Sequence, residues 1–158
     1  MVRRYNEKDL GRIIDIGNAA WREIYSMYHR CYGDELFGIL MPDSENIKGR
    51  QIKEHASRHP ENIFVCEEDS RIVGFITFNL DYQRKIATVG NNAVDPAYRH
   101  KGIGQQMYEV AFRHFREEGM FYAKVTTGLD EAHAPARRAY ERAGFDIRCE
   151  DVTYYKKL

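Results

Sequence analysis

The chain has 158 residues, of which 43% are hydrophobic and 30% charged, a composition typical of one soluble globular domain over residues 1–158. Its 24 basic and 24 acidic residues cancel, which argues against nucleic-acid binding through a basic surface. No window approaches the ~20 apolar residues that span a bilayer. We therefore expect a small-molecule or peptide partner, and neither nucleic acid nor membrane.

The first residues are basic but are not followed by an apolar stretch or a small-residue cleavage site, so we expect a cytoplasmic location. The three cysteines are Cys31, Cys66 and Cys149. Their odd number and wide spacing argue against a disulfide framework and a Cys-rich zinc site. His55 and His59 have the spacing of a helical metal pair but lack an apparent third ligand. We predict no metal.

The first third of the chain is predicted to be a strand followed by two helices. Residues 2–5 form the strand candidate, and Asn6 is a suitable N-cap for the helix after it. Apolar residues then recur at spacings of three and four into the high twenties, which predicts an amphipathic helix. Two glycines and a proline in residues 31–44 predict a loop with a short helical turn. A second helix is expected near residues 45–56.

The middle of the chain has the residue pattern of β-strands. Residues 63–66 and 72–78 are β-rich runs separated by a polar turn, which predicts a hairpin. Another strand is expected over residues 86–94, and Gly90 within it could mark a bulge. A strong amphipathic helix follows over residues 103–118.

The last third continues the alternation of strand and helix. A strand is expected over residues 122–127, and a helix then begins near Pro135 and ends at Gly144. New strands are expected from Phe145 and over residues 152–156. The order of elements predicts a single α/β domain without repeats.

The most informative segment joins a strand to a helix over residues 99–104, which read Arg-His-Lys-Gly-Ile-Gly. A helix N-terminus preceded by glycines lets an anion approach free backbone N–H groups. Met107 stands where a dinucleotide fingerprint needs glycine or alanine, and Gln105 excludes a Walker loop. On these residues alone, the glycines could equally shape a tight turn and nothing more.

Two motifs of this chain resemble those of the GNAT family of N-acetyltransferases. The first is Arg99-x-x-Gly102-x-Gly104, which is similar to the family signature Arg/Gln-x-x-Gly-x-Gly/Ala. The second is His133-x-x-Ala136-x-x-x-Tyr140-x-x-x-Gly144-Phe145. It is similar to a family helix that reads Asn-x-x-Ala-x-x-x-Tyr-x-x-x-Gly-Phe, and only its first position departs.

The resemblance implies a fold, an activity and a cofactor. The expected fold is a mixed, mostly antiparallel sheet of six or seven strands flanked by about four helices, with a splayed central pair at residues 86–94 and 122–127. The implied enzyme is an acyltransferase that uses acetyl-CoA as co-substrate and no metal. It would move the acetyl group to a primary amine by direct attack in a ternary complex.

The resemblance also assigns residues to the cofactor site. Backbone N–H groups of the turn would hold the pyrophosphate, and the preceding strand would pair with the pantetheine arm. The implied cofactor residues are Asn92, Ala93, Val94, Arg99, His100, Lys101, Gly102, Ile103, Gly104, His133, Ala136 and Tyr140.

Two of these residues carry further interpretations. Tyr140 matches the family tyrosine that donates a proton to the departing thiolate, although without the motif it would be one more aromatic on an apolar helix face. His133 replaces the asparagine that contacts the coenzyme arm. It could keep that contact, act as a base or merely cap the last helix.

The base that removes the amine proton has no candidate where many family members place a glutamate, because residues 86–94 contain no carboxylate. Asn91 or Asn92 could hold a water instead. Four other acids are each more typical of a solvated surface than of a base: Glu23, Glu67, Glu68 and Asp81. We assign no base from the sequence.

The resemblance places the acceptor between the first two helices, the central strands and the C-terminal strand. The candidate substrate residues there are Trp21, Tyr25, Tyr28, Asn91 and Tyr154, with Tyr32, Phe37 and Tyr155 near them. Aromatic walls suit an apolar or cationic acceptor, but a helical stripe of aromatics is equally typical of core.

The acceptor is expected to be a small molecule. The alternatives are a protein N-terminus or lysine, or a non-catalytic CoA-binding regulatory module. A homodimer is compatible with the sequence.

Overall fold

The computed structural model describes residues 1–99 and 101–158. Its main elements are β1 (Val2–Arg4), α1 (Leu10–Leu40), α2 (Ile47–Arg58), β2 (Ile63–Glu68), β3 (Arg71–Asp81), β4 (Ile86–Val94), α3 (Ile103–Glu117), β5 (Tyr122–Lys124) and α4 (Ala134–Arg142). Two single turns of 3-10 helix frame the candidate site: η3 (Pro96–Tyr98) and η4 (Glu131–His133).

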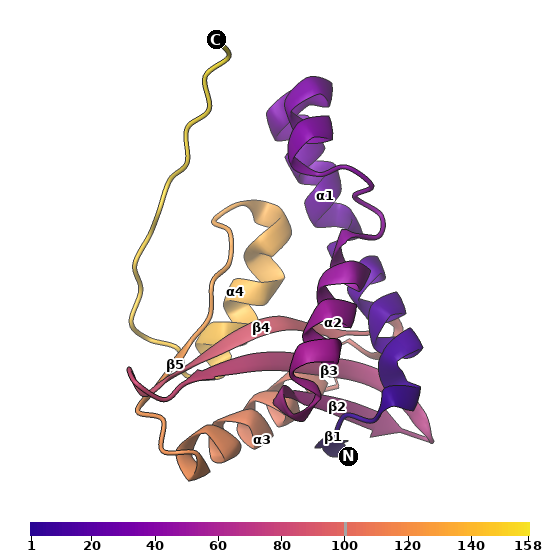
Figure 1. Ribbon diagram of the computed structural model, residues 1–158, viewed down its shortest axis with the longest axis vertical. Helices are drawn as coiled ribbons and strands as arrows, with labels where there is room; N and C mark the ends of the chain where they lie inside the picture. The colour runs from indigo at the N-terminus through magenta and orange to yellow at the C-terminus, as the bar shows by residue number, and fades with distance from the viewer. Residues whose placement is uncertain (100) are drawn as a thin grey trace.

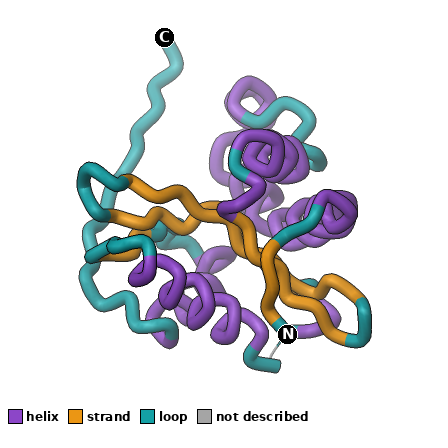
Figure 2. The backbone as a smooth tube through the Cα atoms, turned by 60° about the horizontal axis from the view of Figure 1, so that its bottom comes forward, coloured by secondary structure: helices purple, strands orange, loops and turns teal. Residues whose placement is uncertain are grey.

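The strands form one sheet in the order β1-β2-β3-β4-β5. The first four are antiparallel and β4 pairs with β5 in parallel, so the predicted mixed, mostly antiparallel sheet is confirmed. Helices α1 and α2 cover one face and α3 covers the other (Figures 1 and 2). Burying apolar side chains on both faces fixes the register of every strand.

Each face of the sheet has its own apolar core. Under α1 and α2 the core includes Ile13, Ile52 and Phe75, which are 0% exposed. Under α3 it includes Phe78 and Met107, and Tyr140 of α4 packs against that cluster. Helix α4 is therefore tied to the α3 side, while the turn η4 just before it lies against α1.

The predicted splay is present between β4 and β5. The two strands pair only through Ile86–Thr88 and Tyr122–Lys124. Beyond Thr88, β4 runs on to Val94 with no partner on that side among the described residues. This leaves backbone N–H and C=O groups free along one edge of β4, as strand addition by a ligand requires.

Gly90 lies in a bulge of β4, as the sequence suggested. Ile76 of β3 pairs with Asn92 and Phe78 pairs with Val89, so Gly90 and Asn91 together oppose a single residue, Thr77. The Thr77 hydroxyl donates to the Asn91 carbonyl at 3.2 Å. The Asn91 side chain of this bulge faces the α1 and α2 side of the sheet, where it contacts Lys48 of α2.

Substituting Gly90 with alanine is expected to lower the free energy of unfolding by about 1–3 kcal/mol. The new Cβ would lie 2.6 Å from Thr77 Oγ1, so the bulge would have to shift. Urea unfolding measures the change. Gly38→Ala in α1 is the matched control, because a Cβ there meets no atom within 4 Å and alanine favours the helix. Equal stability of the two variants would contradict the close contact.

Two sequence predictions are wrong. Residues 31–44 are not mainly a loop, because α1 continues through a kink at Gly33 (φ 72°, ψ 169°) to Leu40. Gly33 provides the positive φ that redirects the helix, and helix-forming residues after it allow the helix to resume. The strands expected from Phe145 and over 152–156 are also absent, so the sheet has five strands among the described residues rather than six or seven.

The segment after α4 is an exposed, extended tail instead (Figures 1 and 2). Its first residue, Phe145, packs on the α3-side core. Its far end contacts α1: the Tyr155 ring lies edge-on to Tyr32 at 5.6 Å, and Lys157 pairs with Glu35 at 2.6 Å. A strand needs a neighbouring strand to satisfy its backbone, and no strand of the described sheet pairs with this segment. Among the described residues, no helix combines the length and apolarity needed to cross a membrane.

Candidate active site

The turn between β4 and α3 is anchored at both ends. Asp95 accepts a hydrogen bond from the Ala97 amide at 2.9 Å and forms an ion pair with Arg12 of α1. Burial opposes ionisation of Asp95, but these two partners outweigh it and lower its pKa. At the other end, Gly102 has φ +75° and begins α3, and Ile103 is 1% exposed in the core. The described residues at the two ends of the turn are thus fixed to α1 and to the core.

The N-terminus of α3 is open, as an anion site requires. No described side chain caps it, so its first-turn N–H groups remain available. A Cβ built at Gly104 would meet no atom within 4 Å, which leaves room in front of the backbone. Lys101 lies over the Tyr98 ring at 4.8 Å, and Arg99 is exposed. These residues fit a diphosphate; His100 lies outside the described residues.

Tyr140 belongs to a cluster of polar side chains beside β4, in which Tyr108 is buried and Tyr140 and Asn92 are half-buried. Its hydroxyl is within hydrogen-bond reach of Asn92 and Tyr108, and Tyr108 donates to Asn92 Oδ1 at 2.8 Å. The two tyrosine rings meet edge-on at 6.0 Å. The structure therefore brings two predicted residues, Asn92 and Tyr140, together. Tyr108 was missed, because on the apolar face of α3 it looked like core.

This cluster suits Tyr140 as a proton donor. Burial raises its pKa, and the polar neighbours Asn92 and Tyr108 act in the opposite direction without cancelling it, so the hydroxyl is protonated at neutral pH. Burial raises the pKa of Tyr108 as well. Tyr108 therefore stays protonated and can donate to the phenolate left on Tyr140 after that residue gives up its proton.

His133 and Ala136, the other predicted residues near α4, lie at its first turn. The His133 Nδ1 atom is 2.7 Å from Asp130 Oδ2, and its residue is 9% exposed. Its ring lies 6.1 Å from that of Tyr28 on α1. Asp130 was not singled out from the sequence, although an aspartate three residues before His133 at the start of a helix is a recognisable cap pattern.

The predicted acceptor residues on α1 and β4 meet around a lysine. Lys48 Nζ of α2 donates to Asn91 Oδ1 at 3.1 Å and to Gln51 Oε1 at 2.9 Å, and it lies over the Trp21 ring at 4.6 Å. Burial lowers its pKa to about 8. Lys48 was missed by sequence reasoning, since its contact with Asn91 depends on a bulge 43 residues away.

The aromatic residues farther along α1 lie on the same face of the sheet as Lys48. Burial raises the pKa of Tyr25 to about 12, and Tyr28 stacks on Tyr32 with ring centroids 5.5 Å apart. Tyr154 does not join them: it is 87% exposed on the tail. Four of the five predicted acceptor residues therefore lie on α1 and the bulge of β4, and one lies apart.

Replacing Lys48 with methionine is expected to stabilise the fold by about 1–2 kcal/mol near pH 7, after allowance for partial exposure and the lost Trp21 contact. The pKa falls from 10.5 unfolded to about 8 folded, so the unfolded chain binds this proton more tightly. The charged Lys48 therefore lowers the free energy of unfolding by its full amount below pH 8, about the folded pKa. This loss shrinks as the pH rises from about 8 to 10.5 and is absent above it. Urea unfolding near pH 7 and near pH 10 measures it.

Lys53→Met, at an exposed position of the same helix, is the matched control. Because the Lys53 side chain is exposed, its substitution should change the free energy of unfolding by less than about 0.5 kcal/mol. A Lys48→Met gain that is equal at both pH values would contradict the burial argument.

The acids considered from the sequence are held elsewhere. Glu67 pairs with Arg3 at 2.7 Å beside β1, and Asp81 accepts from the Arg84 amide at 2.9 Å in the turn after β3. Glu23 is exposed on α1, and Glu68 is the backbone register partner of Arg71 at the end of the β2–β3 hairpin. Each of these four acids is therefore engaged in a structural contact or exposed to solvent, and we assign none of them as the base.

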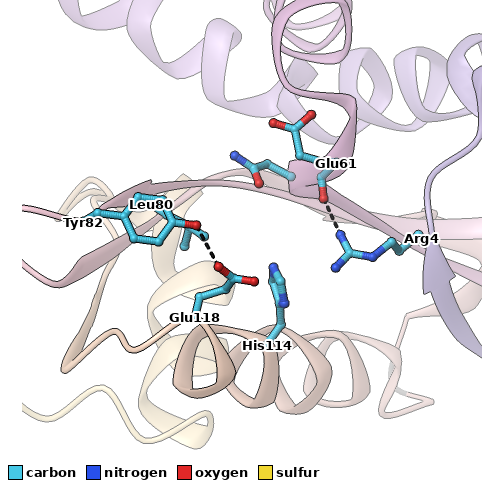
Figure 3. A pocket seen from close by; sticks show the side chains of 7 residues that line it. Arg4, Glu61, Leu80, Tyr82, His114 and Glu118 are labelled. Atoms are coloured by element: carbon cyan, nitrogen blue, oxygen red, sulfur yellow. Dashed lines mark hydrogen bonds between the residues drawn. The ribbon is translucent and has the colours of Figure 1, made fainter.

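One hollow in the described part of the chain lies away from the predicted site. It measures about 330 Å³ and is lined by residues that include Arg4, Glu61, Tyr82, His114 and Glu118 at the C-terminal end of α3 (Figure 3). Hydrogen bonds from Tyr82 to Glu118 and from Arg4 to the Glu61 carbonyl close its rim. His114 packs against aromatic rings of the core. We attach no function to this hollow.

The histidine pair at the end of α2 is not completed into a metal site. The His55 and His59 rings are 5.8 Å apart, and burial lowers the pKa of His55. Among the described residues, no group of three or more potential ligands gathers in one place.

Comparison with known proteins gives a consistent family assignment. The model of the Acetyltransferase (GNAT) family matches residues 21–145. A mycothiol acetyltransferase of Segniliparus rotundus is 32% identical over 61% of this chain, and one of Thermomonospora curvata is 30% identical over 70%. The matches cover only 38% and 35% of those relatives, so the chain spans well under half their length.

Solved structures share the fold. The PaiA N-acetyltransferase of Thermoplasma acidophilum, in complex with coenzyme A, superposes with a TM-score of 0.74 at 18% identity, covering 96% of this chain and 92% of that one. An aminoglycoside acetyltransferase from an uncultured soil metagenomic sample gives 0.62 at 20% identity, covering 100% and 95%.

Proposed function

Because this chain belongs to the acetyltransferase (GNAT) family, we propose that it transfers an acetyl group from acetyl-CoA to a primary amine of a small molecule. The observation that carries the proposal is the half-buried Tyr140 side chain, whose hydroxyl meets Asn92 on β4 just before the open N-terminus of α3. In this proposal a proton donor lies beside an anion site and a free strand edge. Relatives named for acetylation of small molecules support the substrate class.

In this proposal the turn and β4 hold the donor. The first-turn N–H groups of α3, with Gly104 leaving the approach open, bind the pyrophosphate. The unpaired edge of β4 at Asn92–Val94 binds the amide-rich arm as an added strand. These contacts use the main chain, and they orient the thioester in the splay between β4 and β5.

The chemistry then needs two proton movements. The acceptor nitrogen attacks the thioester carbonyl carbon, forming a C–N bond while the C–S bond breaks. Tyr140 gives its hydroxyl proton to the departing sulfur, and Tyr108 stabilises the remaining phenolate. The proton released by the amine must go to another group. The side chains of Trp21, Tyr28 and Asn91 line the acceptor's approach from α1.

A two-stage experiment tests this function. Isothermal titration calorimetry with acetyl-CoA measures donor binding, and a panel of amines, polyamines, amino acids and peptides is then assayed for acceptor-dependent release of CoA. Acetylation of a small amine supports the proposal. Acetylation of peptides alone would transfer it to a protein N-terminus or lysine. Binding without any acceptor would favour a CoA-binding regulatory module and overturn the enzymatic proposal.

A further inference from the structure

We propose that His133, oriented by Asp130, is the base that accepts the proton of the acceptor amine. This inference rests on the proposed acetyl transfer and supplies the group that it lacks. Strand β4, before the turn, has no carboxylate that could accept the amine proton. The structure has an imidazole–carboxylate pair just before α4.

The pair has the geometry of an oriented base. The His133 Nδ1 atom lies 2.7 Å from Asp130 Oδ2. A carboxylate accepts only, so Nδ1 carries the hydrogen and Nε2 keeps the lone pair. Burial opposes ionisation of Asp130, but hydrogen bonds from the ring and backbone of His133 outweigh it and lower its pKa. Asp130 therefore stays ionised and stabilises the imidazolium that forms when Nε2 takes a proton.

The His133 ring does not cap α4, because α4 begins at Ala134 with no side-chain cap hydrogen bond. Asp130 Oδ1 accepts from the His133 backbone amide at 3.1 Å, and this bond caps the turn η4. The second oxygen of Asp130 is left for the ring. A capping role alone would therefore be served by any residue at position 133, and it does not explain a nearly buried imidazole held by the same carboxylate.

The loop before α4 is shaped around this pair. A Cβ at Gly128 would lie 2.4 Å from Asp130 Oδ2 and 2.5 Å from His133 Nδ1, so only glycine lets the backbone pass so closely. Arg137 Nη1 donates to the carbonyls of Gly128 and Asp130 at 2.7 and 2.6 Å. Two further residues are thus committed to holding the carboxylate and the ring in place.

The pair also lies between the two halves of the proposed site. The His133 ring is 6.1 Å from that of Tyr28 on α1, the helix that carries the predicted acceptor residues. His133 is the N-cap of α4, and Tyr140 follows it by seven residues, about two helical turns or 10 Å along the same face. The titratable or charged groups that face His133 are Asp130 and Arg137 on its own side and Tyr28 from α1.

The proton balance closes with this assignment. His133 Nε2 takes the amine proton, directly or through one water, as the nitrogen bonds to the carbonyl carbon. Tyr140 supplies the proton that the sulfur takes as the C–S bond breaks. His133 then loses a proton to solvent and Tyr140 regains one, so the products are the acetylated amine and the free thiol.

His133→Asn is the discriminating variant, because asparagine is the residue that the related motif has at this position. If His133 only contacts the coenzyme arm, asparagine keeps activity. If it is the base, kcat falls about 100-fold or more, while the Kd for acetyl-CoA by calorimetry stays within about threefold. Asp130→Asn, which preserves the cap, should lower kcat about 10- to 100-fold.

His29→Asn is the matched control. His29 also pairs with an aspartate, Asp34, at 2.6 Å, but both are exposed on α1, and its substitution should leave kcat unchanged. Wild-type kcat in His133→Asn, or a loss explained by weaker acetyl-CoA binding, would overturn the inference. If His133→Asn does not fold, unaltered kcat in Asp130→Asn overturns it. An inactive wild-type protein would instead refute the proposed function.

Discussion

Replacing Tyr140 with phenylalanine is expected to lower kcat for the proposed acetyl transfer about 100-fold or more. The substitution removes one hydroxyl and keeps the ring, which packs against Tyr108 at 6.0 Å and Phe145 at 5.9 Å. Folding and donor binding should therefore be preserved. Steady-state kinetics with the best acceptor of the amine panel measure the loss, and calorimetry with acetyl-CoA checks binding.

Tyr108→Phe separates the proton donor from its support. Tyr108 lies behind Tyr140 and donates to Asn92 at 2.8 Å, so its loss removes one hydrogen bond from the cluster but no proton from the reaction. We expect kcat to fall by about 10-fold, the value of one hydrogen bond of about 1.4 kcal/mol. A Tyr140→Phe variant no slower than Tyr108→Phe would rule out Tyr140 as the acid.

The sheet and its long helices could be predicted because their signals are local. Strand β4 was expected over residues 86–94 and is Ile86–Val94, and α3 was expected from Ile103. Periodic apolar residues, a glycine bulge and glycine-rich helix ends determine such elements within a few residues of sequence. The GNAT fold and family are likewise confirmed.

The errors arose where the structure depends on distant neighbours. Gly33 was interpreted as part of a loop, although its positive φ only kinks α1. The run from Phe145 has strand-forming residues, but whether it pairs depends on where α4 delivers it. Propensity alone could not tell an extended tail from a sixth strand.

In the candidate site too, residues in local motifs could be predicted, and residues that act through distant contacts could not. The turn at residues 99–104 and Tyr140 are contained in short motifs and were identified in advance. Lys48 and Tyr108 act through contacts with Asn91 and Asn92, 43 and 16 residues away, which no local pattern reveals. The roles of all these residues remain predictions that the variants decide.

Gly104→Leu is expected to weaken acetyl-CoA binding about 100-fold without harming the fold. A Cβ at this position meets no atom within 4 Å, and leucine favours a helix more than glycine does, so stability should be equal or higher. The added side chain would occupy the space in front of the first-turn amides. Losing two charge-assisted hydrogen bonds of about 1.5 kcal/mol each corresponds to that factor.

Gly104 is a better test of the proposed pyrophosphate site at the α3 N-terminus than Gly102. Any other residue at position 102 would be strained, because Gly102 has φ +75°. Gly38→Leu is the matched control, because position 38 is also open and lies in a helix remote from the turn. Calorimetry should give wild-type affinity for Gly38→Leu and a large loss for Gly104→Leu, with both proteins melting no earlier than the wild type. Unchanged affinity in Gly104→Leu would mean that the pyrophosphate does not approach the α3 N-terminus at this point, and the donor would have to be placed elsewhere along β4.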